Sequence, residues 1–557
     1  MAEATPEALQ QAPARKIKWK DVRESFTGYI FIAPAFLIIF IFGLFPIVFS
    51  VYVSLYQWRI NPGDYIALGN YTRAFGNLAY IVAFWVAAIF LYLAARSFQK
   101  IWREASSHGA RIWLWAVPSL LLTAALGLFT RFFFLFLPEI LAIATKVRGQ
   151  TTSQDLFVKL LGEAWQAPVV QESLKQFLLV FTIGLIVTYL VYRIFGNNSK
   201  YLSDNNTLIN AFTMLGLSIG LFWLTWTEIQ GAYTAALEEG IELEIWAQIV
   251  TISAGFGLLL ISWLTWRSGV KQDSNLGMIL KLVAAAMLAV GAWVLIAELP
   301  RIVQAGDDGW WQGLLVTVYY AIGTVPLQLF LALFLAVLLF QEIKGKGLYR
   351  LIFFLPYITP AVAAAAVFRV LFSGRPNGPI NSLLGAFGVE PLLWLDEPTG
   401  IFRMITGGIL PEWAAGPSLA LAVIIIYNIW SYVGYDIVIF LAGLGGIPGE
   451  LYEAAAIDGA GRWEKFRHVT LPLLSPTTYF LTLLSVIGTF KAFNHVWVLR
   501  KAAALGTTDT ASIVIFTEFN RNTRYGYASS LAIILLLIIL VLTVINNRIA
   551  EEKVFYG

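Results

Sequence analysis

The segment PGELYEAAAIDGAGRWEKFRHVTLPLLSP, residues 448–476, decides the fold because it is a charged stretch between two strongly apolar runs. Pro448 suits the first position of a helix, and acidic residues just after it favour the positive end of the helix dipole. Residues 451–457 are strong helix formers, and Gly459 ends that helix. The first half of the segment therefore predicts a short helix closed by a glycine turn.

The second half of the segment continues the turn into another helix. Residues 462–469 are basic and aromatic, and Leu471-Pro472 disfavours a simple helical continuation into the next apolar run. Ala454 and Ala455 would let the backbone of another protein come close, and Glu453 offers one fixed charge. The pattern predicts a helix-glycine-helix elbow beside a membrane, suited to docking, and it contains no evident catalytic group.

Composition places the whole chain in a membrane. The sequence is 58% hydrophobic and only 13% charged, and its mean hydropathy is +0.72. A soluble domain cannot bury so much apolar surface, so the chain is a polytopic membrane protein. The absence of cysteine excludes disulfides, thiolate metal sites and cysteine nucleophiles. The basic excess lies mainly in loops between apolar runs, which indicates membrane orientation rather than nucleic-acid binding.

The elbow resembles the EAA loop of importer-type ABC permeases. The resemblance rests on Glu453-Ala454-Ala455, on Gly459 at the expected spacing and on Leu471-Pro472, with Val469 in place of the usual isoleucine. The fuller string resembles the carbohydrate-uptake branch, in particular permeases of the maltose-transporter type. In that family the loop is a coupling helix seated in a cleft of the ATPase subunit, so the resemblance implies that these residues couple to an ATPase.

The N-terminal part of the chain fits the same family only at first. Residues 1–28 form a polar segment with a basic cluster, expected on the cytoplasmic side by the positive-inside rule. The run 29–58 is long enough to be the first transmembrane helix. Asn70-Tyr71 resembles the short external motif that follows the first helix in sugar permeases.

An inserted block, residues 77–308, then departs from the family. It contains about six further apolar runs long enough to span a bilayer. They are residues 80–96, 112–137, 177–194, 208–228, 247–266 and 279–297. An even number of inserted helices returns the chain to the outer face, which the following core requires. The block is expected to widen the membrane collar, bind lipid or contact an accessory chain, and the first of these is the simplest.

Residues 309–557 are predicted to form the rest of the permease core, with the elbow at 448–476. Its helices are expected at 314–340, 351–372, 418–444, 477–498 and 527–544. A Pro/Gly-rich external loop spans 373–417, and residues 381–387 are expected to form a short amphipathic piece in it. The family resemblance makes this loop a contact for a binding protein, and a solvated connector is the alternative.

Polar side chains inside the two helices that flank the elbow mark a candidate pathway, because such groups are costly in a membrane unless they face protein or water. Hydroxyl, amide and aromatic groups suit the hydrogen bonding and stacking of a sugar. The candidate substrate residues are Asn428, Ser431, Tyr432, Tyr435, Thr489, Phe493 and Asn494. The alternative is that these groups satisfy one another at helix contacts. For Asp436 and Lys491 a structural role is favoured.

Cofactor sites are not apparent in the sequence. Gly345-Lys346-Gly347 lacks the upstream glycine and the hydroxyl residue of a P-loop, so ATP and magnesium are expected on partner subunits, with no cofactor and no metal site in this chain. The three histidines are scattered, and no catalytic set of side chains stands out. The chain is therefore expected to be a transport subunit and not an enzyme.

The predicted fold is an all-α polytopic membrane protein, in which an importer-type ABC permease core of about six helices carries about six inserted ones, about 12 in all. The resemblance implies the permease subunit of a sugar importer in a bacterial or archaeal cytoplasmic membrane, with both termini cytoplasmic and a maltose- or maltodextrin-like oligosaccharide as the best substrate. It implies two copies of an ATPase subunit, a second homologous permease, an extracytoplasmic solute-binding protein and membrane lipid as partners, and no nucleic acid.

The alternative function is an ion-driven secondary transporter of a polar solute. It would show repeated halves and discontinuous helices with acidic residues at mid-membrane, which the sequence does not display clearly.

Overall fold

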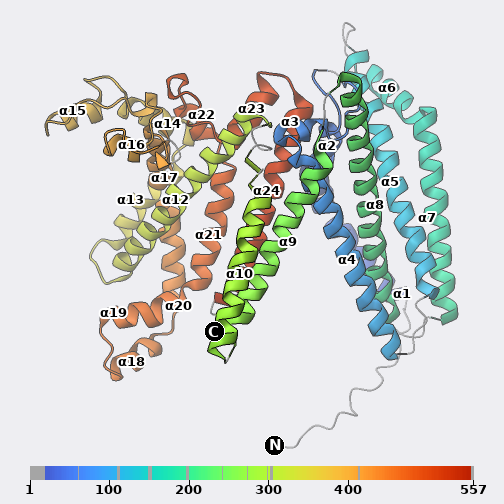
Figure 1. Ribbon diagram of the computed structural model, residues 1–557, viewed down its shortest axis with the longest axis horizontal. Helices are drawn as coiled ribbons and strands as arrows, with labels where there is room; N and C mark the ends of the chain where they lie inside the picture. Colours follow the sequence, from blue (N-terminus) through green and yellow to red (C-terminus); the bar gives the residue numbers. More distant parts are fainter. Residues whose placement is uncertain are drawn as a thin grey trace, which may run out of the picture. The chain divides into compact units, whose positions relative to one another are not determined.

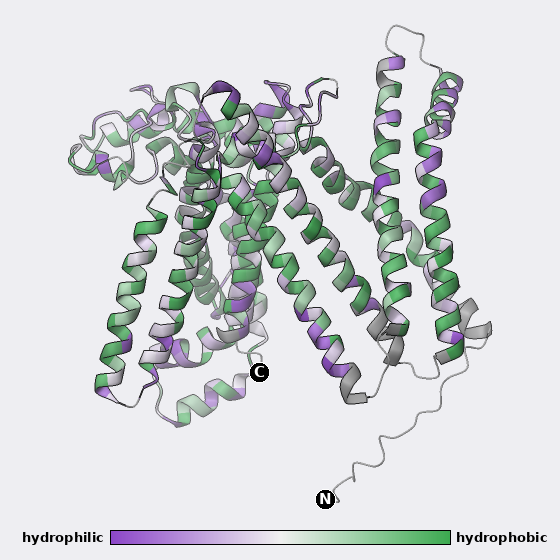
Figure 2. Ribbon diagram, turned by 45° about the vertical axis from the view of Figure 1, so that its right-hand side comes forward, coloured by the Kyte–Doolittle hydropathy of each residue, from purple (hydrophilic) through white to green (hydrophobic). Residues whose placement is uncertain are grey.

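The described part of the chain folds almost entirely into helices. The computed structural model describes residues 19–60, 62–108, 113–147, 153–195, 200–240, 243–272, 274–297, 299–300, 305–411 and 414–553 (Figure 1). Within these ranges the only β-pairing is two isolated bridges. Ten described helices are long and apolar enough to cross a membrane, and two bent pairs raise the number to as many as 12. Apolar residues line much of their length (Figure 2). The predicted all-α polytopic membrane fold is confirmed.

The chain divides into two compact units. The first comprises residues 1–48 and 77–300, and the second comprises residues 49–76 and 301–557. The boundary near residue 48 falls inside the first membrane-length helix, Thr27–Ser54, so this helix contributes to both units. The second part of the first unit begins at Asn77, where the inserted block was expected to begin, and ends at Pro300.

Long helices that pack in pairs form the first unit. Helix α9 packs along α10, α4 packs along α8, and α5 contacts both α7 and α8. The bounds are α1 (Trp19–Ile39), η2 (Phe40–Leu44), α4 (Leu78–His108), α5 (Trp113–Lys146), α6 (Gln154–Gln166), α7 (Pro168–Phe195), α8 (Lys200–Glu239), α9 (Ile245–Val270) and α10 (Asn275–Ile296). The six predicted apolar runs correspond to α4, α5, α7, α8, α9 and α10. Helix α6 was not predicted, because it is amphipathic and too short to span.

The second unit is built around α12 and α17, which pack along each other and bury large side chains such as Tyr320, Tyr427 and Phe440. Its membrane-length or bent elements are α12 (Asp308–Phe340), α13 (Lys346–Ile358), α14 (Ala361–Leu371), α17 (Leu419–Gly445), α21 (Ser475–Phe490) and α24 (Tyr525–Lys553), together with the part of α2 (Phe45–Ser54) from Phe49 onward. Its short elements are α3 (Gly69–Phe75), α15 (Pro379–Gly385), η3 (Trp394–Asp396), α16 (Ile401–Ile405), α18 (Gly449–Ile457), α19 (Arg462–Lys465), η5 (Phe466–Thr470), α20 (Leu471–Leu473), α22 (Asn494–Leu499), η6 (Ala502–Ala504) and α23 (Ala511–Asn520).

The Asn70-Tyr71 pair closes the end of the first membrane helix. The Asn70 side-chain amide donates to the carbonyl oxygens of Ser54 (2.8 Å) and Tyr56 (3.0 Å). The Tyr71 hydroxyl lies 2.7 Å from the Ser54 hydroxyl. Since the last carbonyls of a helix have no partner within the helix, these bonds satisfy groups that would otherwise be unpaired. The motif therefore has a local structural role here.

Two predicted core helices are broken. The helix expected at 351–372 is two helices, α13 and α14, that meet at Thr359-Pro360 with a bend of 94°. Pro360 explains the break, because a proline disfavours the helical conformation of the residue before it, and Thr359 is extended (ψ 133°). The helix expected at 477–498 ends at Phe490, and α22 follows only at Asn494. Residues 491–493 contain no proline or glycine, and the nearest glycine, Gly488, lies inside α21, so the sequence pattern did not predict the break.

One prediction follows from the close crossing of α13 and α17. A Cβ atom on Gly434 would lie 1.9 Å from the carbonyl oxygen of Phe353, which is backbone and cannot rotate away. We expect Gly434→Ala to destabilise the protein by about 2 kcal/mol, as overpacking does. The check is the thermal unfolding midpoint of the purified protein in detergent. Gly445→Ala on the same helix, where a Cβ meets nothing within 4 Å, is the control. Equal midpoints for the two variants would contradict the crossing.

Candidate functional site

The elbow forms as two short helices joined at a glycine. Helix α18 ends before Gly459, whose φ of +80° lies in the left-handed region that only glycine adopts at low cost. Helix α19 follows, and the Tyr452 hydroxyl of α18 lies 3.0 Å from the Thr470 hydroxyl of η5, so the two arms are tied together. Pro448 lies immediately before the first helical residue, Gly449, one position earlier than expected.

A widened turn carries the elbow back toward the next membrane helix. Residues Phe466–Thr470 form a π-helical turn, in which the Leu471 N–H donates to the Phe466 carbonyl. Pro472, which has no N–H to donate, follows directly. The chain then bends by 61° between Arg462–Leu473 and Ser475–Phe490. The second arm therefore continues helically through Leu473, beyond the predicted end at 469, and the effect of Leu471-Pro472 is seen as this bend.

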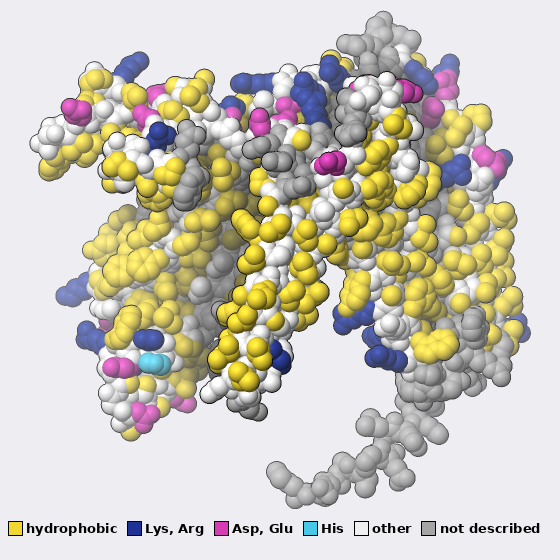
Figure 3. All heavy atoms as spheres, viewed as in Figure 1, with side chains coloured by type: hydrophobic (Ala, Val, Ile, Leu, Met, Phe, Trp, Pro, Cys, Tyr) yellow, Lys and Arg dark blue, Asp and Glu magenta, His cyan; other side chains and the backbone are white. Residues whose placement is uncertain are grey.

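The exposed surface of the elbow carries both large apolar and charged side chains. Ile457 is 86% exposed and Trp463 is 65% exposed, although both are large and apolar. Charged side chains surround them, and Figure 3 shows both signs of charge at the end of the second unit that carries α18 and α19. Of the predicted coupling residues, Ala455 is half-buried, and the exposed ones are Glu453, Ala454, Gly459, Leu471 and Pro472. Exposed large apolar groups rimmed by charge are typical of a protein-protein contact.

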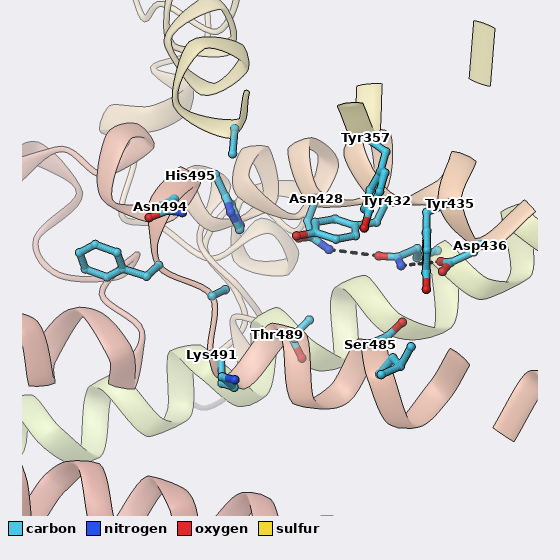
Figure 4. A pocket seen from close by; sticks show the side chains of 16 residues that line it. Tyr357, Asn428, Tyr432, Tyr435, Asp436, Ser485, Thr489, Lys491, Asn494 and His495 are labelled. Carbon is cyan, nitrogen blue, oxygen red and sulfur yellow. Dashed lines mark hydrogen bonds between the residues drawn. The ribbon is translucent and has the colours of Figure 1, made fainter. Parts of the chain in front are cut away.

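A cavity of about 370 Å³ lies in the second unit (Figure 4). This volume is in the range of small-molecule sites. Helices α12, α13, α14, α17 and α21 and the segment 491–495 form its wall. The lining residues are Gln328, Tyr357, Ala361, Asn428, Tyr432, Tyr435, Asp436, Leu484, Ser485, Gly488, Thr489, Lys491, Ala492, Phe493, Asn494 and His495. Six of the seven predicted substrate residues therefore lie around one cavity. The seventh, Ser431, is buried on α17 and is not part of the lining.

A buried polar chain runs along one wall of the cavity. The Asn428 side-chain amide donates to Oε1 of Gln328 (3.1 Å), and Nε2 of Gln328 donates to Oδ2 of Asp436 (2.6 Å). All three residues are buried. Because each member is held by its neighbour, the chain fixes the direction in which amide and carboxyl groups face the cavity. No ion pair joins Asp436 to Lys491 in the described residues, and Lys491 is exposed.

Aromatic rings form a second wall. The Tyr357 ring of α13 stacks on the Tyr435 ring of α17, with centroids 4.9 Å apart and planes 25° apart. Tyr357 also meets Tyr432 edge to face at 5.7 Å. Flat aromatic faces beside hydrogen-bonding groups suit a solute that has one polar side and one apolar side.

His495 completes the lining at the start of α22. Its Nε2 lies 2.8 Å from the Tyr320 hydroxyl, and its ring stacks on that of Tyr427 at 5.1 Å. Among the described residues, no group of three His, Cys, Asp or Glu could hold a metal ion.

Ten of the sixteen lining residues were not predicted as substrate residues, among them the polar residues Gln328, Tyr357 and Ser485. Gln328 was detectable as a polar group inside a long apolar helix. Tyr357 was not, because its place depends on the bend at Pro360. Ser485 lies in the helix predicted at 477–498, and its spacing of four residues from Thr489 places both side chains on one face of that helix.

Comparison with known proteins gives a consistent set of relatives. Residues 302–553 match the family described as binding-protein-dependent transport system inner membrane component. The chain is similar to the probable ABC transporter permease protein YesP of Bacillus subtilis, with 34% identity over 255 residues, covering 45% of this chain and 75% of that protein. It is similar to the trehalose/maltose transport system permease protein MalF of Thermococcus litoralis, with 30% identity over 253 residues, covering 45% and 78%.

The chain is also similar to a further curated relative and to a chain in a solved structure. The lactose transport system permease protein LacF of Rhizobium radiobacter is 31% identical over 253 residues, covering 44% of this chain and 78% of that protein. A crystal structure of a bacterial alginate ABC transporter, in complex with an alginate pentasaccharide-bound periplasmic protein, contains a chain 23% identical to this one. The match has a TM-score of 0.39 and covers 45% of this chain and 81% of that chain.

Proposed function

The chain belongs to the inner-membrane permeases of binding-protein-dependent ABC importers, in the carbohydrate-uptake branch, and from this premise we propose that it forms the sugar path while the elbow couples that path to ATP hydrolysis in a separate subunit. The family resemblance predicted from residues 448–476 is confirmed by these relatives. The chain is thus a multi-pass membrane transport component. The proposal extends this to the roles of the elbow and of the cavity.

The elbow supports the coupling part of the proposal. Ile457 and Trp463 of the elbow are largely exposed among the described residues, and the turn at Gly459 joins α18 to α19. The bend at Leu474 connects the elbow directly to α21, which contributes Ser485 and Thr489 to the cavity. A push on the elbow would therefore move a wall of the cavity, which is the mechanical link that an importer without its own nucleotide site needs.

The cavity supports a sugar as the solute. Its amide, hydroxyl and carboxyl groups can exchange hydrogen bonds with sugar hydroxyls, and the Tyr357–Tyr435 pair offers a face for the apolar side of a pyranose ring. We propose a maltose- or maltodextrin-like oligosaccharide as the substrate, bound by Asn428, Tyr432, Tyr435, Thr489, Phe493 and Asn494, with Ser431 in support behind them. Relatives named for lactose and for arabinooligosaccharides make these the sugars to compare.

The external loop offers a structured contact for a solute-binding protein. Asn381 of α15 is buried and holds the loop together through bonds to the backbone of Ser373, Arg375 and Leu392. Lys501 pairs with Asp396 at 2.8 Å and ties the loop to the segment after α22. A loop fixed in this way can present one shape to a partner. We propose two ATPase subunits, a second permease and a binding protein as the partners, ATP and magnesium on the ATPase, and both termini in the cytoplasm.

The observation that carries the proposal is the exposed elbow joined to a cavity wall, and co-purification tests it. We expect a Walker-motif ATPase and a second permease to be recovered with the chain from its native membrane in mild detergent, identified by mass spectrometry. Combining Glu453→Ala with Gly459→Leu should remove most of the ATPase. The control combines Glu239→Ala with Gly240→Leu, since Gly240 has a φ of +69° and an equally open surrounding. Equal ATPase recovery from both double variants would contradict docking at the elbow.

Two structural features make a second function worth testing. The broken α13–α14 pair and the buried Asp436 are the kind of feature that the ion-driven alternative would show. If the wild-type chain repeatedly came out alone and moved sugar in ATP-free vesicles under a proton or sodium gradient, that alternative would replace the importer. The family match and the elbow favour the importer.

A further inference from the structure

A basic pocket lies at the turn between α9 and α10, in the first unit, and the proposed transport path does not use it. Its volume is about 690 Å³, and it is lined by Leu264, Arg267, Ser268, Lys271, Gln272, Ser274 and Lys281. Three of these side chains are cations and none is acidic. Asp273 lies in the same turn of the sequence, so three cations and one carboxylate leave a net charge of +2 over residues 264–281.

Close packing of the two helices holds Lys281 in the pocket. A Cβ on Gly269 would lie only 3.1 Å from the Cβ of Lys281, so the absence of a side chain at Gly269 lets α10 approach α9 at this level. The Lys281 ammonium donates to the Ser268 hydroxyl at 3.0 Å. An ammonium has three N–H donors, so two remain for another acceptor. No carboxylate pairs with Lys281 in the part of the chain that the structure describes.

The position of Lys281 along its helix favours an anionic ligand. It lies six residues into the membrane-length helix Asn275–Ile296, roughly 9 Å along the axis at 1.5 Å per residue. The neighbouring apolar side chains are exposed, Val270 to 61% and Leu280 to 61%, and Figure 3 shows an apolar surface along the α9–α10 hairpin. A cation at the edge of the hydrocarbon region is costly unless it reaches water or an anion.

We propose that this pocket binds the headgroup phosphate of an anionic phospholipid, with Arg267, Lys271 and Lys281 as its donors and the acyl chains lying on the exposed face of α9 and α10. Guanidinium and ammonium groups form their strongest hydrogen bonds with such charged oxygens. The Arg267 guanidinium lies 5.5 Å from the Trp263 ring centroid, which orients it at the boundary between headgroup and hydrocarbon. The apolar rim selects a lipid over a free phosphate ion. The inserted block thereby gains a lipid-binding role that is independent of the sugar.

Native mass spectrometry of the whole chain with its partners tests this inference. The protein is taken from nanodiscs that contain equal amounts of phosphatidylglycerol and phosphatidylcholine, and the retained lipid is counted during stepwise delipidation. Combining Arg267→Gln with Lys281→Gln should lower phosphatidylglycerol retention by about tenfold and leave phosphatidylcholine unchanged. Lys281→Arg, which keeps the charge, should retain the lipid as the wild type does.

A matched control and three outcomes decide the result. Lys175 is an exposed lysine seven residues into α7, outside this pocket, so Lys175→Gln should change nothing. The inference is overturned if Lys175→Gln lowers retention as much as the double variant does, or if the double variant keeps its phosphatidylglycerol. Displacement of the lipid by millimolar inorganic phosphate would also overturn it, because the pocket would then be a site for a free ion.

Discussion

Transport by the Gly459→Leu variant is expected to fall at least tenfold, although the protein should insert and accumulate as the wild type does. Gly459 holds a φ of +80°, and a side chain in this conformation costs about 1 kcal/mol. Since a Cβ there meets nothing within 4 Å, the fold itself has room for the leucine. The larger effect is expected because the leucine side chain would keep the elbow from seating in the cleft of the ATPase subunit, where we propose that it binds. The measurement is ATP-dependent sugar uptake into vesicles that contain the assembled importer.

Gly459→Ala separates strain from bulk. Alanine carries the same backbone cost but adds only one methyl group, so its uptake should lie between those of the wild type and the leucine variant. Gly240→Leu repeats the strain at a turn of the inserted block with an equally open surrounding, and its uptake should stay near that of the wild type. If Gly459→Leu transported normally, or if Gly240→Leu were as impaired, the elbow would not be a seated coupling element.

The elbow could be predicted from the sequence because local chemistry dictates it. Gly459 must adopt a left-handed turn, Pro472 cannot donate a backbone hydrogen bond, and the charged segment has apolar runs on both sides, so each feature is written in neighbouring residues. The long apolar helices were predictable for the same reason. The π-helical turn at Phe466–Thr470 was not, because it depends on how the second arm meets α21.

The cavity was predictable only in part. Helical spacing places Asn428, Tyr432 and Tyr435 near one face of α17, but it cannot say which neighbouring helix they meet. The bond from Gln328 to Asp436 joins residues 108 positions apart, and the stacking of Tyr357 on Tyr435 depends on the 94° bend after α13. Such contacts follow from the rotation of each helix about its axis, which an almost uniformly apolar sequence leaves undetermined.

The break after Phe490 shows the same limit within one element. The chain over residues 477–498 is apolar enough to continue as one helix, yet it leaves the helical path at 491–493 and places Lys491 and Phe493 on the cavity. Irregular backbone inside a membrane is tolerated where it lines a cavity or is buried in protein. The break is therefore explained by the site it borders, and only the folded structure reveals it.

The second large effect is expected at the aromatic wall. Replacing both rings, by Tyr357→Ala combined with Tyr435→Ala, should raise the concentration of sugar-loaded binding protein for half-maximal stimulation of ATP turnover by about tenfold, while basal turnover stays within about twofold of wild type. The stacked pair offers one face to the sugar, and stacking worth about 1.4 kcal/mol corresponds to a factor of ten. The measurement is ATPase activity of the reconstituted importer, with loaded binding protein added at increasing concentration.

Single variants then assign the two rings. Tyr435→Phe keeps the stacking and removes one hydroxyl, so it should lose less than Tyr435→Ala. Tyr349→Ala, on the same α13 helix but exposed and outside the lining, should change neither parameter. Equal losses of basal and stimulated turnover in the double variant would mean that the rings only hold α13 against α17, because a packing defect affects every state of the cycle. A selective loss of stimulation requires that the rings meet the sugar, since basal turnover proceeds without it.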